Sequence, residues 1–61
     1  MGRKMIEVFG TVIRETDLAI LAECGDGEVW LPKSQLEDWP DIDCDGEILM
    51  TEWIAEQKEL I

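Results

Sequence analysis

The sequence predicts a mainly β protein that ends in one α-helix, and three observations lead to this fold class. Residues 5–15 alternate between two faces, Gly25-Asp26-Gly27 separates two further apolar runs, and Thr51 precedes a stretch with helical spacing. We expect the order β-β-β-β-α, folded as a small bent antiparallel sheet or an SH3-like partial barrel. The 61 residues are expected to form a single small domain, since so short a chain builds only one core.

The first strand is expected over residues 5–15, where β-branched and aromatic residues dominate. Ile6, Val8 and Val12 share one face of it. Gly10 lies on the same face in the middle of the run. It predicts a bulge or a sharp bend, as a small barrel needs where one strand serves two sheets.

Two shorter strands follow over residues 18–24 and 28–31. In the earlier of them, Leu18, Ile20 and Ala22 are expected to share one face. The glycines between the strands can adopt positive φ angles, which is typical of a tight hairpin. Pro32 ends the third strand because it has no amide hydrogen to donate.

The C-terminal half is expected to contain one more strand and the helix. One helical turn is predicted over residues 33–38, and an irregular acidic loop is predicted over residues 39–45. The fourth strand is expected over residues 46–50. Thr51 then caps a helix of two to three turns that runs to Ile61.

The net charge of the chain limits the classes of partner that it can bind. Fifteen acidic and five basic residues give a formal net charge of −10. This charge disfavours direct binding to nucleic acid or to an anionic membrane, because such binding depends on Lys and Arg. No apolar run approaches the roughly 18 residues of a membrane span, and we expect no secretory signal. A cytoplasmic protein is therefore expected.

Residues 41–52 read DIDCDGEILMTE, which matches the ligand pattern of a calcium-binding EF-hand loop. The ligands would be Asp41, Asp43, Asp45 and Glu52. The flanking sequence argues against the match, because Pro40 leaves no room for an entering helix and Leu49 offers no oxygen at the ninth position. A calcium-binding module stays an alternative, and no metal or other cofactor is favoured.

Catalysis is not expected. The chain has no His and no Tyr, and Ser34 beside Lys33 would become a nucleophile only if a pocket desolvated the lysine. Cys24 and Cys44 cannot complete a four-ligand zinc site without histidine, and we expect two reduced thiols. The sequence therefore predicts a non-enzymatic protein.

The tryptophans and the acidic run are the candidate binding residues. Trp30 is out of phase with its apolar neighbours, so it faces outward or packs under the terminal helix, whereas Trp53 is expected in the core. Trp39 is expected as a lid over the barrel or as a contact residue.

Residues 37–47 hold six acids and no base, either as a solvated loop or as a phosphate-like array for a basic groove. The predicted protein-binding residues are Glu37, Asp38, Asp41, Asp43, Asp45, Glu47, Trp30 and Trp39.

Several motifs resemble those of short acidic proteins from bacteriophages and other mobile elements. The motifs are Glu15-Thr16 with Ala19 and Leu21, the run EVWLPKSQ over residues 28–35, and EWIA over residues 52–55 with Lys58, Leu60 and Ile61. The most specific parts are WLPKSQ and the EWxAxxKxLI ending. The resemblance implies a setting in which small acidic proteins include inhibitors of host defence, among them anti-CRISPR proteins.

The preferred prediction is a binding protein whose acidic surface binds a basic protein surface. The partner would be a nucleic-acid-binding host protein, with this chain as a nucleic-acid mimic. The calcium module is one alternative, and a small-barrel nucleic-acid binder that uses Trp30, Lys33 and Gln35 is another. An uncovered edge strand would also allow a homodimer.

Overall fold

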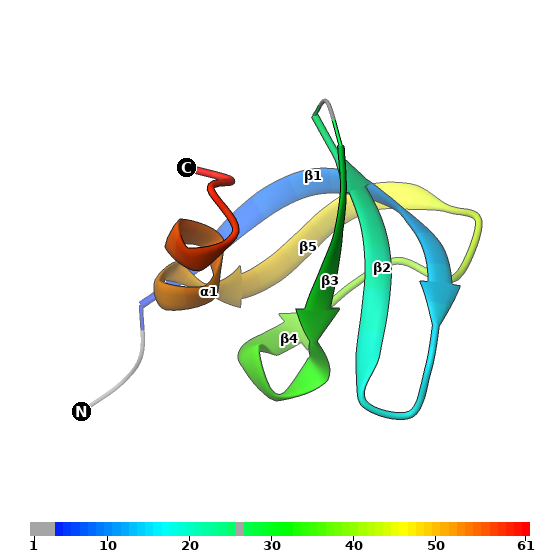
Figure 1. The fold of residues 1–61 in the computed structure, drawn as a ribbon, viewed down its shortest axis with the longest axis horizontal. Helices are drawn as coiled ribbons and strands as arrows, with labels where there is room; N and C mark the ends of the chain where they lie inside the picture. The colour runs from blue at the N-terminus through cyan, green and yellow to red at the C-terminus, as the bar shows by residue number, and fades with distance from the viewer. Residues whose placement is uncertain (1–3, 26) are drawn as a thin grey trace.

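The computed structural model describes residues 4–25 and 27–61, and Figure 1 shows a single curled sheet with a short helix at one end. The elements are β1 (Met5–Glu15), β2 (Ala19–Cys24), β3 (Gly27–Pro32), the 3₁₀ helix η1 (Lys33–Gln35), β4 (Leu36–Asp38), β5 (Asp45–Thr51) and α1 (Glu52–Gln57). The strand order is β3-β2-β1-β5-β4, and all neighbours are antiparallel. The predicted mainly β class with a C-terminal helix is confirmed, and the sheet is not closed into a barrel.

β1 is the central strand, and it pairs with two partners along different parts of its length. Met5 to Thr11 pair with β5, whereas Thr11 to Glu15 pair with β2. The register shifts between Val12 and Arg14, so the irregularity that was expected at Gly10 lies further along the strand. A long central strand shared in this way lets a small sheet curl around its own core.

Gly10 has a different role, which is close packing between strands. A Cβ atom at this position would lie 2.8 Å from Cys24 Sγ and 2.9 Å from the carbonyl oxygen of Glu23. Both contacts are shorter than van der Waals packing allows. Only glycine therefore fits where β1 crosses the end of β2.

The core fills the concave side of the sheet. Val12, Ile20, Leu31, Ile48 and Met50 are fully buried there, as the alternation of their strands requires. The helix α1 packs on β1 and β5 and covers the core with two buried residues, Ile54 and Ala55.

Two predictions about the placement of apolar residues were wrong. Trp53 is 57% exposed, because Ile54 and Ala55 take the inward positions of the short helix. Leu18 is 80% exposed, because it lies in the turn before β2 and not in the strand. Thr16 Oγ1 holds that turn by accepting hydrogen bonds from the backbone N–H groups of Leu18 (3.3 Å) and Ala19 (3.1 Å).

The predicted helical turn over residues 33–38 was correct only for its first half. The 3₁₀ helix ends at Gln35, and Leu36 is extended and pairs with Met50 as the start of β4. A strand of three residues depends on its neighbour for hydrogen bonds and leaves no alternating pattern of its own.

The terminal helix is also shorter than predicted. Glu59 has a φ angle of 58°, and the backbone N–H of Leu60 donates to Ala55 O at 2.8 Å. The N–H of Glu59 donates to Glu56 O at 3.1 Å. These two bonds form a Schellman motif, which ends α1 before Ile61. No helix in the described part of the chain is long and apolar enough to cross a membrane.

Candidate protein-binding surface

The side of the sheet that faces away from the core, here called the outer face, carries a row of acidic residues. Strand pairing places Glu28 opposite Glu23, Glu23 opposite Thr11, and Thr11 opposite Asp45. These four residues therefore cross β3, β2, β1 and β5 side by side, and we call them the acidic row. Its three carboxylates are exposed, and Thr11 is half-buried.

The acidic row has no ion pair with a cation in the described part of the chain. The ion pairs among residues 4–25 and 27–61 join Lys4 with Glu52 at 3.4 Å and Lys33 with Glu15 at 2.6 Å. Glu23 and Glu28 lie directly opposite one another, an arrangement of like charges that destabilises a sheet. The fold thus keeps an unfavourable charge pair on an exposed face.

The loop between β4 and β5 continues this acidic surface, and backbone hydrogen bonds hold it against β1. The N–H of Asp43 donates to Val12 O at 2.7 Å, and the N–H of Val12 donates to Cys44 O at 3.1 Å. Within the loop, the N–H of Cys44 donates to Asp41 O at 3.0 Å. Asp43 has a φ angle of 65°, which aspartate tolerates better than most residues. The backbone of the loop therefore has a defined position against β1.

The structure brings together most of the acids that the sequence singled out. Asp45 and Glu47 lie on the outer face of β5, and Asp38 of β4 pairs with Leu49 beside them. Asp41 and Asp43 lie at the adjoining end of the sheet, and Glu37 is exposed on β4. All six acids of residues 37–47 are exposed.

The two candidate tryptophans lie in different surroundings. Trp30 is 45% exposed on the outer face of β3, where it pairs with Leu21, so it faces outward. Trp39 is half-buried and packs against the core, with the Nζ atom of Lys33 5.6 Å from the centre of its ring. Trp39 therefore fits the expected lid better than a contact residue.

Three residues of the outer face were missed from the sequence, namely Glu23, Glu28 and Phe9. The predicted hairpin contained the signal for two of them. Counting outward from its turn pairs residue 24 with 27, and therefore Glu23 with Glu28. Phe9 is 64% exposed and pairs with Glu47. This pairing joins β1 to β5, which is far away in the sequence, so no local pattern could reveal it.

The EF-hand interpretation does not fit this geometry. Residues Asp45 to Thr51 form an extended strand, which separates its two ends by about 20 Å. Glu52 follows that strand and cannot join Asp41 and Asp43 around one ion. The described residues contain no group of three or more His, Cys, Asp or Glu side chains arranged to hold a metal ion.

Two of the three residues proposed for direct nucleic-acid binding have partners within the fold, whereas Trp30 is exposed. The ammonium group of Lys33 donates to Glu15 Oε2 at 2.6 Å, and Gln35 Oε1 accepts a hydrogen bond from Thr51 Oγ1 at 2.9 Å. Lys33 is also the residue that would have to activate Ser34 as a nucleophile. Its ammonium nitrogen lies against the Glu15 carboxylate, and no hydrogen bond between the side chains of Lys33 and Ser34 is present among the described residues.

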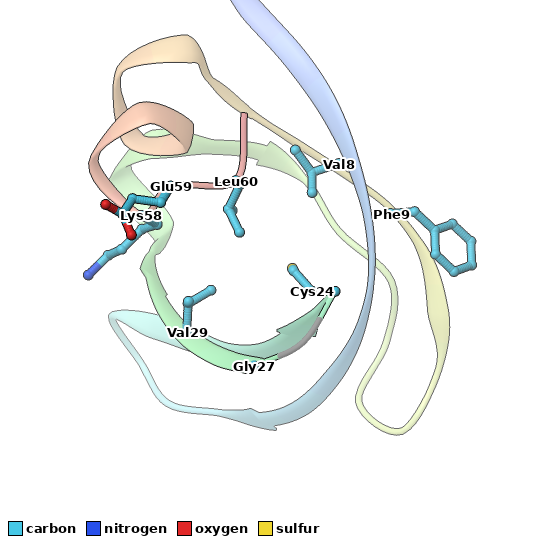
Figure 2. A pocket seen from close by; sticks show the side chains of 9 residues that line it. Val8, Phe9, Cys24, Gly27, Val29, Lys58, Glu59 and Leu60 are labelled. Atoms are coloured by element: carbon cyan, nitrogen blue, oxygen red, sulfur yellow. The ribbon is translucent and has the colours of Figure 1, made fainter.

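A cavity of about 390 Å³ opens on the concave side of the sheet, and Figure 2 shows it. Val8, Cys24, Val29 and Leu60 point into it, whereas the ring of Phe9 points away to the outer face. Burial raises the pKa of the Cys24 thiol, which keeps the sulfur protonated and weakly nucleophilic at neutral pH. Cys24 and Cys44 are both free thiols.

Fold and surface together define a small open-sheet protein with an acidic, convex outer face. No family model, curated protein or solved structure matches the chain.

Proposed function

We propose that this chain is a non-enzymatic binding protein whose acidic outer face binds a basic surface on a partner protein. The observation that carries the proposal is the acidic row, in which Glu23 and Glu28 oppose each other without a paired cation in the described residues. Like charges held in register cost stability, and a partner with lysines and arginines would relieve that cost. Strand pairing fixes the backbone positions of these residues, and their carboxylates are exposed before binding.

The shape of the face favours a partner with a groove. The sheet curls around its core (Figures 1 and 2), so the outer face that carries the acidic row is convex. A protein that binds nucleic acid presents a concave basic site to a polyanion. We therefore propose a nucleic-acid-binding host protein as the partner, with this chain as a mimic of its ligand.

The sequence resemblance supplies a biological setting for this proposal. In a bacteriophage or mobile element, an acidic mimic would act in the host cytoplasm and would inhibit a host-defence protein by occupying its nucleic-acid site. An anti-CRISPR role is one form of this inhibition. The acidic face would also speed association through electrostatic steering.

A competition assay tests the proposal. Purified nucleic-acid-binding defence proteins of the host would be loaded with fluorescent DNA or RNA, and anisotropy would report displacement by this chain. We expect displacement that weakens as salt increases, since screening acts on exposed charges.

Two triple variants with equal net charge make the assay specific. One variant reverses Asp41, Asp45 and Glu47 to lysine on the acidic surface. The control reverses Asp17, Glu56 and Glu59, which are exposed outside it. We expect the first variant to lose displacement and the control to keep it. Unchanged displacement by the first variant, or equal loss in both, would contradict the proposal.

A further inference from the structure

Two exposed aromatic residues lie on the outer face beside the acidic residues. A surface that bound its partner through charge alone would not need them. Phe9 lies on the central strand β1, opposite the carboxylate of Glu47, and is 64% exposed. Trp30 lies on the edge strand β3, opposite Leu21, and is 45% exposed. An exposed ring forgoes the stabilisation that its burial would bring, so both rings leave apolar surface available to a partner.

The register shows how these rings are placed relative to the acidic row. Trp30 is the next outward residue after Glu28 on β3, so its pair with Leu21 lies along one side of the row. Phe9 is the next outward residue before Thr11 on β1, so its pair with Glu47 lies along the other side. The acidic row therefore runs between the two rings, which are roughly 17 Å apart over the sheet surface.

This arrangement combines two kinds of recognition on one face. Carboxylates in the middle select a positively charged partner and repel an acidic one. Large aromatic side chains are the residues that most often become buried anchors in protein interfaces. Nucleic acid would be repelled by the row. A flexible polycation would satisfy the carboxylates without burying either ring.

We infer that Phe9 and Trp30 are anchors with which the outer face binds a strip of protein surface that is basic in its middle and apolar at both ends. This inference rests on the proposed function and adds the chemistry of the partner to it. The carboxylates of the acidic row pair with lysines or arginines of the partner, and each ring enters an apolar site beside them. The interface is then partly resistant to salt, because burial of the rings does not depend on screening.

Two synthetic helical peptides of equal charge provide the test. Both carry the same lysines and are about 14 residues long, roughly 21 Å as a helix, which spans the two rings. One has leucine and the other glutamine at the remaining interface positions. Calorimetric titration of the full chain at low and high salt measures both affinities. We expect the lysine-leucine peptide to bind at least about tenfold more tightly, with the larger advantage at high salt.

Variants assign the preference to the two rings. In the double variant F9S/W30S we expect the tenfold preference to disappear while the lysine-glutamine peptide keeps its affinity. The control L18S removes an exposed apolar residue from the turn between β1 and β2, outside the outer face, and should keep the preference. Circular dichroism checks that each variant is folded.

The outcomes separate this inference from the proposed function. Equal affinities of the two peptides for the unmodified chain, or an equal loss in L18S, would overturn the role of the rings and leave the acidic surface as proposed. Binding of neither peptide would contradict the proposed function as well. Backbone NMR shifts centred on Thr11 and its neighbours, and absent around α1, would place the peptide on the outer face.

Discussion

The sulfur atoms of Cys24 and Cys44 have opposite surroundings, which gives the first prediction at the residue scale. Cys24 is 8% exposed beside Gly10, and burial raises its pKa above the ordinary value of 9.0. Above that pH the unfolded chain releases the thiol proton while the folded chain retains it. The stability associated with this group is therefore complete below about pH 9 and is lost as pH rises toward the folded pKa.

We expect the free energy of unfolding to fall above about pH 9 more steeply in the unmodified chain than in C24A. Urea titrations followed by tryptophan fluorescence measure this difference. C44A removes an exposed thiol and serves as the matched control, with the slope of the unmodified chain. A C24A slope as steep as that of C44A would show that other groups cause the dependence.

Gly10 gives a second residue-scale prediction, which concerns packing. In G10A the new methyl group would meet Cys24 Sγ and the backbone of β2, so we expect a loss of about 1–3 kcal/mol in the free energy of unfolding. G27A is the control, because a Cβ atom there meets nothing within 4 Å. Chemical denaturation compares the two, and equal stabilities would show that β1 and β2 can separate at no cost.

At the scale of elements, Thr51 joins three parts of the fold. Its Oγ1 atom accepts from the N–H of Ile54 at 3.2 Å, which caps α1 as predicted. The same hydroxyl donates to Gln35 Oε1 at 2.9 Å and so ties the helix to η1. Thr51 is buried, so neither hydrogen bond is easily replaced by water.

We expect T51A to lower the free energy of unfolding by about 1–2 kcal/mol, while T51S keeps most of it because it retains the hydroxyl. Thermal unfolding of the two variants measures the difference. The prediction is wrong if T51S is destabilised as much as T51A, since the lost methyl group would then be the cause.

The elements also show where sequence patterns were sufficient. Residues 5–15 were predicted with the bounds that β1 has, because eleven alternating residues give a strong local signal. The short strand β4 was missed, because Leu36 becomes extended only by pairing with Met50. Trp53 was placed wrongly because a six-residue helix buries few positions, and its orientation on the sheet decides which ones.

At the scale of the whole molecule, we expect the proposed function and the stability of the fold to place opposite demands on the outer face. Replacing Glu28 by glutamine removes the repulsion with Glu23, so we expect E28Q to raise Tm by about 1–4 °C at low salt. The rise should shrink at high salt because the charges are then screened. E56Q removes one charge from the exposed side of α1 and serves as the control.

The same E28Q variant should bind a basic partner more weakly, with the lysine peptides of the titration as the measured probe. A variant that is more stable and binds less well would show that the charge pair is kept for recognition. If E28Q were less stable than the unmodified chain, the two carboxylates would have to be held apart or bridged. The acidic row would then not support the proposed function.

The sequence by itself determined the mainly β class, the bounds of β1, the hairpin between β2 and β3, the cap at Thr51 and the acidic character of residues 37–47. These features depend on alternation, turn residues and composition, which act between residues close in the chain. Only the tertiary structure decided that Glu23, Glu28 and Phe9 join Asp45 on one face. The physical reason is that β1 pairs with β2 and also with the distant β5, and this long-range register sets which side chains become neighbours.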